Sequence, residues 1–232
     1  MWKTRFGIVA LAAVFSFGTG CNPVTLAYFL AGGPKDLTQP DFVLKTPEGR
    51  KEIRILVLAS AQLGLSTDVI GVDQLLASEF ISAMLTNQGN DPEGKKKKLT
   101  FIPSNKVQKY LSDHPNWHLR QPTEIGEEFE VDYVIYLDVT RMRLRKPGSA
   151  QLLQGRAEIS VTAYDLNRKE DAKAPFSKEF SSEFPRQFEK DIMDTPLPKF
   201  RKEFVRTVAN ELTWIFLPHP YEESRYRVDS AN

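Results

Sequence analysis

The chain has 232 residues, of which 41% are hydrophobic and 26% are charged, a balance typical of one globular domain with extensions. Its 31 basic and 30 acidic residues give a formal net charge of +1, so the charge balance does not indicate nucleic acid or another polyanion as a partner. The single cysteine, Cys21, excludes an intrachain disulfide framework and any metal site built from several cysteines.

The start of the chain has the features of an export signal. A positively charged beginning with Lys3 and Arg5 precedes an uncharged, mostly apolar stretch over residues 6–17, and small side chains follow up to Cys21. We therefore predict a signal peptide over residues 1–20. Two alternatives stay open. Because residues 6–33 carry no charge, the stretch is also long enough for an uncleaved spanning helix, which needs about 20 residues, and the leader also suits a secreted protein without an anchor.

The sequence Gly18-Thr19-Gly20-Cys21 resembles the lipobox of bacterial lipoproteins. In that family the cysteine is acylated, with fatty acids such as palmitate, and becomes the new N-terminus. Gly20 and Cys21 match the motif, whereas Gly18 stands where the family prefers an aliphatic residue. The resemblance implies lipidation at Cys21 and a mature protein held in a membrane of the cell envelope, facing the periplasm. Asn22, in place of the aspartate that favours inner-membrane retention, slightly favours the outer membrane.

Proline and glycine recur between Cys21 and Arg50 and interrupt any regular element there. This composition predicts a linker over residues 21–50. A single soluble α/β domain is predicted over residues 51–218, because no second linker is visible within it. Residues 219–232 are predicted to form a polar C-terminal tail.

The first half of the domain alternates strands with helices. The β-branched and aliphatic run from Ile53 to Ala59 predicts a buried strand. A helix is predicted from Val72 to Asn87, because apolar residues recur there at three- and four-residue spacing. Residues 99–103 predict a second strand, parallel to the first because a helix separates them. Ser104 suits the N-cap of a short helix, and a further helical turn is expected near residues 123–130.

The second half shows the period-two alternation of strands. Strands are predicted over residues 133–144 and from residue 153 onward, where the odd positions are apolar or small and the even positions mostly polar. Phe176, Phe180 and Phe184 alternate with polar residues in a third strand, so the three form an antiparallel meander. The last helix is predicted over residues 197–216. We expect the phenylalanine stripe to fill the core against that helix rather than to dock a partner.

The predicted order of elements is therefore β-α-β-α-β-β-β-α. It indicates an α+β fold with a single mixed β-sheet and helices packed on one face, the simplest arrangement that buries all the apolar stripes.

Sequence motifs of catalysis are missing from the chain. It contains no nucleophile elbow, P-loop, dinucleotide fingerprint or zinc-protease helix motif. We therefore predict that the protein is not an enzyme, and that it has no catalytic residue, cofactor or metal.

The three histidines are the next candidates for a metal site. His114 and His118 stand four residues apart, a spacing that places two ligands on one face of a helix. Pro115 disfavours that helix, so we expect two ordinary exposed or capping histidines. His219 follows the last helix and is expected in a rigid turn.

Two charged clusters have both a functional and a plain interpretation. Glu127, Glu128, Glu130 and Asp132 could supply a general acid and base, but adjacent exposed carboxylates share one environment, so we expect a solvated face. The run Lys95–Lys98 could contact anionic headgroups, yet it lacks interleaved aromatics, so we expect a solvated loop and no nucleic-acid partner.

Taken together, these features resemble a known group of proteins. The lipobox, the linker, the first strand and helix, the run from Val131 to Val139 and the run from Gly155 to Asp165 look like envelope lipoproteins with a curli-secretion or Tol-propeller N-terminal type of domain. The ending Phe216 to Pro220 is similar to uncharacterised lipoproteins of planctomycete-type bacteria. Such domains are accessory, assembly or scaffold parts of envelope machines.

The resemblance implies a lipid-anchored, non-enzymatic interaction module. Its partners would be the membrane, through the lipid, and another envelope protein, approached by edge-strand pairing. The alternative is a periplasmic small-ligand-binding or catalytic domain with a site on loops such as residues 60–71. The oligomeric state is left open.

Overall fold

The structure is a computed structural model that describes residues 37–61, 69–90, 97–167 and 174–220. The predicted signal peptide, Cys21 and the first part of the linker lie outside these ranges and stay predictions. Lys95 and Lys96, most of the tail and much of the loop over residues 60–71 also lie outside them. No helix within the described ranges is long and apolar enough to cross a bilayer.

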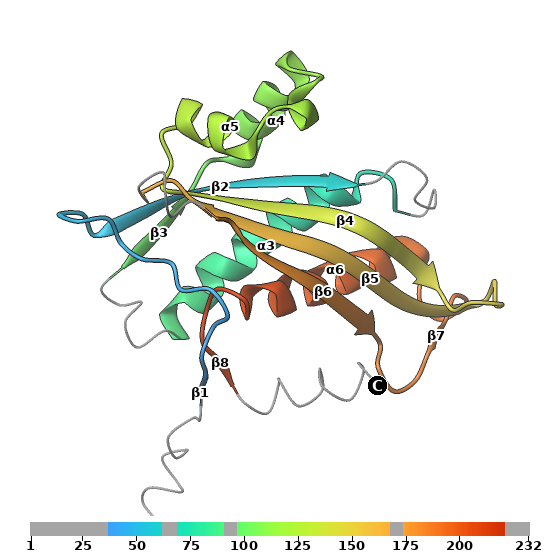
Figure 1. The fold of residues 1–232 in the computed structure, drawn as a ribbon. Helices are drawn as coiled ribbons and strands as arrows, with labels where there is room; N and C mark the ends of the chain where they lie inside the picture. Colours follow the sequence, from blue (N-terminus) through green and yellow to red (C-terminus); the bar gives the residue numbers. More distant parts are fainter. Residues whose placement is uncertain (1–36, 62–68, 91–96, 168–173, 221–232) are drawn as a thin grey trace, which may run out of the picture.

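A mixed β-sheet forms the centre of the domain (Figure 1). Its strands are β2 (Glu52–Ala61), β3 (Lys98–Phe101), β4 (Tyr133–Arg145), β5 (Leu152–Asp165), β6 (Phe176–Phe184) and β7 (Lys190–Asp191). They lie in the order β3-β2-β4-β5-β6, with β7 paired to β5. β2 is parallel to β3 and β4, whereas β4, β5 and β6 form the expected antiparallel meander. The predicted parallel pairing of the first two strands is thus confirmed.

Four α-helices are described: α3 (Val72–Asn87), α4 (Ser104–Asp113), α5 (Pro122–Glu128) and α6 (Leu197–Thr213). The 3-10 turns η2 (Gln88–Asn90) and η4 (Trp117–Leu119) follow α3 and α4. The two long helices, α3 and α6, share one face of the sheet, while α4 and α5 stand over the other face at one end (Figure 1). The predicted α+β class with one mixed sheet is confirmed.

The larger core lies between the sheet and the pair α3–α6. The odd positions of β5 from Leu153 to Ala163 are all buried, as the alternation predicts. Phe180 is buried in the same core, and the Phe184 ring lies 5.9 Å from that of Phe200 on α6, which confirms that the phenylalanine stripe fills the core. A Cβ at Gly155 would lie 2.6 Å from Cγ of Phe204, so only glycine admits this ring.

A smaller core lies under α4 and α5. Val107 of α4 and Ile125 of α5 pack with Leu56 and Leu58 of β2 and with Val134. Since the alternate residues of β2 belong to the larger core, both faces of this strand are covered. Burial on both sides explains why β2 is apolar at every position from Ile55 to Ala59 rather than at alternate positions.

The described part of the predicted linker, residues 37–50, packs on the domain. β1 (Leu37–Thr38) pairs antiparallel with β8 (His219–Pro220), and the amide of Phe42 donates to the carbonyl of Ile215 at 2.8 Å. Leu44 is buried in the larger core. Leu44 and the pairing of β1 with β8 hold the segment on the domain, although many of its residues stay exposed, so the domain begins at least 13 residues before Arg50 in the described chain.

Two predicted helix ends need correction. Pro103 is the N-cap of α4 and makes no side-chain capping hydrogen bond, and Ser104 is the first residue of the helix. The last helix ends at Thr213 rather than at residue 216. Beyond it the chain tightens, because the amides of Trp214, Ile215 and Phe216 donate to carbonyls three residues back, a usual way for a helix to end.

Candidate functional site

A cleft of about 290 Å³ lies between α3 and α4, beside the end of β3. It forms because β3 has four residues whereas β2 has ten, so β2 continues past its neighbour. Val57 and Ala59 of β2 form the floor and Trp117 closes one end. The side walls are Asp73, Gln74, Ala77 and Ile81 of α3 and Ser104, Val107, Gln108, Leu111 and Ser112 of α4.

The floor of the cleft is an unpaired strand edge. The amide of Ile102 donates to the carbonyl of Ile55 at 3.0 Å, the last hydrogen bond between this edge of β2 and the chain of β3. Backbone groups of alternate residues point to the same edge of a strand, so Val57 and Ala59 present their N–H and C=O groups to the cleft. No hydrogen bond within the described ranges uses these groups, although both residues are buried, at 3% and 8% exposure.

The opposite edge of β2 is fully used. β4 pairs with β2 from Ile55 to Ala61 in parallel register. A ligand of β2 can therefore approach only from the cleft side.

Two glutamines join the walls at the solvent side. Nε2 of Gln108 donates to Oε1 of Gln74 at 3.5 Å, linking α4 to α3. Both side chains are exposed, and a hydrogen bond of this length is weak. The link therefore offers little resistance to a molecule entering the cleft.

Trp117 is held by the turn that follows α4. The Trp117 amide donates to the carbonyl of His114 at 2.9 Å, and the Trp117 carbonyl accepts a hydrogen bond from the amide of Arg120 at 3.0 Å. Its indole ring meets the ring of Tyr136 edge-on, with centroids 6.3 Å apart. The cleft wall is thus connected to the central strand β4.

Tyr136 begins a short hydrogen-bonded chain at the carboxyl end of β2, beside the first half of β4. The Ser60 hydroxyl donates to Oδ1 of Asp138 at 2.7 Å. Since this uses the only hydroxyl proton of Ser60, the Tyr136 hydroxyl donates to Ser60 Oγ, at 2.8 Å. Burial raises the pKa of the Tyr136 phenol, Ser60 opposes the shift, and Asp138 adds to it. The phenol therefore stays protonated at neutral pH and keeps its role as donor.

The α4–α5 segment that forms one wall of the cleft is braced by an ion pair. Arg120 donates to Oε1 of Glu128 at 2.6 Å and to the Tyr110 hydroxyl at 2.5 Å. The hydrogen bond from Arg120 is the main reason that the pKa of Glu128 lies below its usual value. Burial and then Glu128 raise the pKa of Tyr110. These contacts fix the angle between the two short helices.

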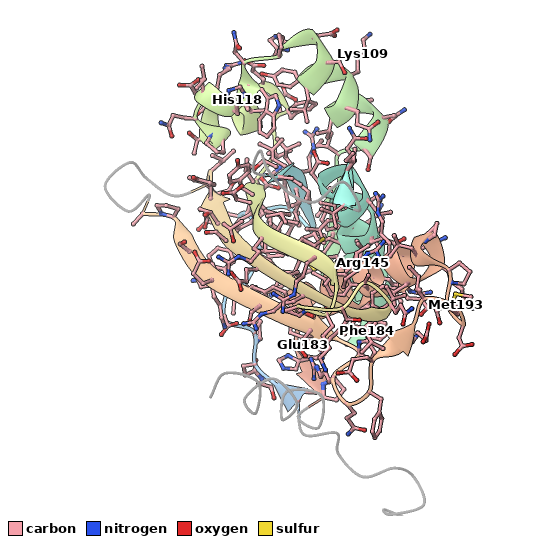
Figure 2. The ribbon with its side chains drawn as sticks, turned by 90° about the vertical axis from the view of Figure 1, so that its right-hand side faces the viewer. Lys109, His118, Arg145, Glu183, Phe184 and Met193 are labelled. Atoms are coloured by element: carbon pink, nitrogen blue, oxygen red, sulfur yellow. The ribbon has the colours of Figure 1, made fainter. Side chains whose placement is uncertain are left out.

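His114 and His118, which were expected to be ordinary exposed or capping histidines, lie apart from any ligand cluster among the described residues. His114 caps the end of α4, where its Nδ1 lies 2.9 Å from the carbonyl of Tyr110 and its ring stacks on the Tyr110 ring. His118 is exposed on η4, on the segment that projects from the sheet (Figure 2). Among the described residues, no group of three or more His, Cys, Asp or Glu could hold a metal ion.

The expectation for His219 was wrong. This residue lies in β8 rather than in a turn and is 7% exposed. Its ring stacks on that of Trp214, with centroids 4.9 Å apart. The pairing of β8 with β1 folds the chain end back onto α6, which sequence periodicity gives no means of foreseeing.

The carboxylate cluster divides into two environments. Glu127, Glu128 and Glu130 are exposed, as expected, and Glu128 is paired with Arg120. Asp132, in contrast, is 3% exposed, and this corrects the prediction of a fully solvated face. It forms an ion pair with Arg50 and accepts a hydrogen bond from the Arg54 amide at 2.8 Å. Asp132 therefore fastens the start of β2 and has no free face for chemistry.

The described end of the lysine run lies at the amino end of the sheet. Lys98 begins β3, and its amide donates to the carbonyl of Lys51 at 2.9 Å. Arg50, Lys51, Glu52, Arg54 and Lys98 border a shallow hollow there. The acidic partners of Arg50 and Arg54, namely Asp132 and Glu130, offset much of its positive charge.

The cleft itself was missed by sequence reasoning. The sequence predicts Val57 and Ala59 only as part of a buried strand, and no pattern around Trp117 indicates a role. One signal was available, because the predicted first strand, residues 53–59, has seven residues and the predicted second strand, residues 99–103, has five. Parallel neighbours of unequal length leave part of the longer strand without a partner.

No protein-family model and no curated protein matches the chain. Similar solved structures include the PelC dodecamer from Paraburkholderia phytofirmans, at 6% identity and a TM-score of 0.37 over 72% of this chain and 89% of that chain. Lipoprotein GNA1162 from Neisseria meningitidis is 15% identical, with a TM-score of 0.35 over 69% of this chain and 98% of that one. The hypothetical protein CT253 from Chlamydia trachomatis is 12% identical, with a TM-score of 0.36 over 71% and 98%. Similarities of this size carry no conclusion about function.

Proposed function

We propose that this protein is a lipid-anchored cell-envelope lipoprotein whose domain acts as a non-enzymatic interaction module. One observation carries the proposal. The cleft presents buried backbone donors and acceptors of Val57 and Ala59 that no described residue pairs. Buried backbone groups are almost always hydrogen-bonded, so the fold leaves a place for an outside molecule.

The anchor is the second part of the proposal. The lipobox-like sequence ending at Cys21 supports acylation there, and a periplasmic domain on an outer-membrane anchor agrees with Asn22 in the following position. Residues 21–36 precede the described domain, and a chain of that length spans at most about 55 Å when extended. The domain would therefore work within a limited distance of the bilayer.

Two measurements test the anchor. We expect intact-mass analysis of the protein from bacterial membranes to give a chain that begins at Cys21 and carries acyl groups. The Cys21→Ser variant should lose the lipid and leave the membrane fraction. A native chain that begins at Met1, or at residue 21 without lipid, would overturn this part.

Site-specific photo-crosslinking in cells tests the interaction. A photoreactive amino acid at Gln108, exposed on the cleft wall, should give a discrete adduct with one envelope protein, identified by mass spectrometry. The matched control is the same amino acid at Gln187, which is exposed in the segment after β6. Equal adducts at both positions, or none at Gln108, would contradict a partner at the cleft.

A second candidate function has its own observation. The Tyr136–Ser60–Asp138 chain lies at the carboxyl end of β2, beside the parallel strand β4, and the connections of these two strands diverge, β2 toward β3 and β4 toward β5. Open sheets commonly bind ligands at such a point. A small polar ligand there would raise the unfolding temperature of the wild type but not of Asp138→Asn, a difference that a thermal-shift panel measures.

A further inference from the structure

We propose that the cleft binds an extended peptide segment, which adds as a strand to the free edge of β2 in line with β3 and carries a basic residue two positions from an apolar one. This inference rests on the proposed interaction module and specifies the chemistry of its partner.

The backbone of the cleft floor is the first step. A ligand must offer donors and acceptors that match the N–H and C=O groups of Val57 and Ala59, two residues apart on one strand edge. An extended peptide backbone has this spacing, as strand addition to exposed edges in other proteins shows. The line of β3, which ends at Phe101, is open beyond Ile102 because the chain turns into α4 at Ser104. An added segment would therefore continue a ladder that β3 has already begun.

The two walls of the cleft would contact alternate side chains of the bound peptide. Side chains of neighbouring residues in a strand point to opposite faces of a sheet. Residues opposite Val57 and Ala59 would face α3, and the residue between them would face α4. The apolar part of the α4 wall consists of Val107 and Leu111, and Trp117 of η4 closes the cleft beside it, so the middle position favours an apolar side chain.

The α3 wall changes along its length. α3 returns the chain from the carboxyl end of β2, so its first turn with Asp73 lies near Ala59, and Ile81, two turns on, lies toward Val57. Asp73 makes no ion pair with any described residue. The position opposite Ala59 therefore favours Lys or Arg, and the position opposite Val57 favours an apolar residue.

The far edge of the sheet is a poorer candidate. β6 ends the sheet on the other side, and Figure 2 shows Glu183 and Phe184 at the end of this strand. Lys178, Glu179 and Glu183 place charges along it, a common way in which proteins protect an edge from pairing. No described helix walls a cleft beside it. The observations therefore favour the β2 edge.

Peptide binding to the full chain in detergent tests the inference. The probes are two fluorescent, N-acetylated and C-amidated heptapeptides with the central sequences Val-Leu-Lys and Lys-Leu-Val, which cover the parallel and antiparallel directions. We expect one of them to bind in fluorescence anisotropy. Each is also made with N-methyl groups on either alternate set of amides. N-methylation of the amides that face β2 should lower the affinity at least tenfold, whereas N-methylation of the other set should leave it unchanged. If only the side chains bound, both sets would have the same effect.

Protein variants test the same contacts from the other side. Ala59→Pro removes the N–H that faces the cleft and leaves the ladder to β4, which uses the intervening residues. We expect at least tenfold weaker binding. Asp73→Lys should lower the affinity for the Lys-containing probe and raise the affinity for the same peptide with Glu in place of Lys. This exchange of preference keeps the test valid if Ala59→Pro fails to fold. Trp117→Ala should weaken both probes.

Two results would overturn strand addition at β2. One is the absence of binding by either probe up to about 1 mM, and the other is equal binding of both N-methylated sets. If the Gln108 adduct still formed in cells, the interaction module would stand with a partner of other chemistry. If the adduct were missing as well, the proposed function itself would fail.

Discussion

The two faces of the sheet are built very differently. One is closed by the long helices α3 and α6 over a large core in which Phe80, Phe200 and Phe204 are fully buried. The other carries a small core under the short helices α4 and α5 at one end, and the even positions of β5 beyond it are only partly buried or exposed. The closed face supplies most of the buried apolar area and hence most of the stability. The other face is free to hold a cleft.

The strongest test of this difference is a cavity in the closed face. Phe204→Ala should lower the free energy of unfolding by about 3–5 kcal/mol, because a buried aromatic ring is lost and the rigid sheet cannot fill its space. Urea denaturation measures the change. Phe188→Ala is the control, since Phe188 is 79% exposed and its loss should stay within about 0.5 kcal/mol. Similar losses for both variants would show that the closed face is not the main core.

Adding a methyl group to the same core should lower the free energy of unfolding by a smaller amount. Gly155→Ala places a methyl group against the Phe204 ring and should destabilise the protein by about 1–3 kcal/mol. Phe204→Leu in the same chain should relieve part of this cost, so that the double variant is more stable than the sum of the two single changes predicts. Strict additivity would mean that the two residues do not share the contact.

The smaller core should show a weaker and more local effect. Ile125→Val removes one methyl group beneath α5 and should cost about 0.5–1.5 kcal/mol. Hydrogen exchange should quicken in α4 and α5 and stay unchanged in α3 and α6, because loosely packed segments open separately from the main core. A uniform increase over all four helices would indicate one cooperative unit and remove the distinction between the faces.

The smallest expected effect is a pH dependence of the α4–α5 brace. The hydrogen bond from Arg120 lowers the pKa of Glu128 below its ordinary value of 4.5. The stabilisation by the Arg120–Glu128 pair is therefore complete above the ordinary pKa of Glu128 and is lost as the pH falls through the lowered pKa. Hydrogen exchange of α5 should quicken in this acid range. Glu128→Gln should abolish this pH dependence of hydrogen exchange. Glu127 is an exposed neighbour, so Glu127→Gln should retain it.

Sequence periodicity predicted the elements of the closed face well. The α3 bounds, the alternation of β5 and the stripe of Phe176, Phe180 and Phe184 are found as expected, because each reflects a repeated contact with one large core. Predictions were poorer where a single long-range contact decides. Asp132 was placed on a solvated face but pairs with Arg50, 82 residues away, and His219 was placed in a turn but pairs through β8 with β1.

The sequence by itself determined the α+β class, the main strands and helices, and the lipobox-like leader, since these are written in local periodicity and composition. Only the tertiary structure decided the sheet order, the packing of Phe42 and Leu44 against the domain and the cleft beside β2. The cleft exists because β2 extends beyond the end of β3 and because α3 and α4 pack on opposite faces of the sheet. Strand pairing and helix placement join residues far apart in the chain, so no local pattern records them.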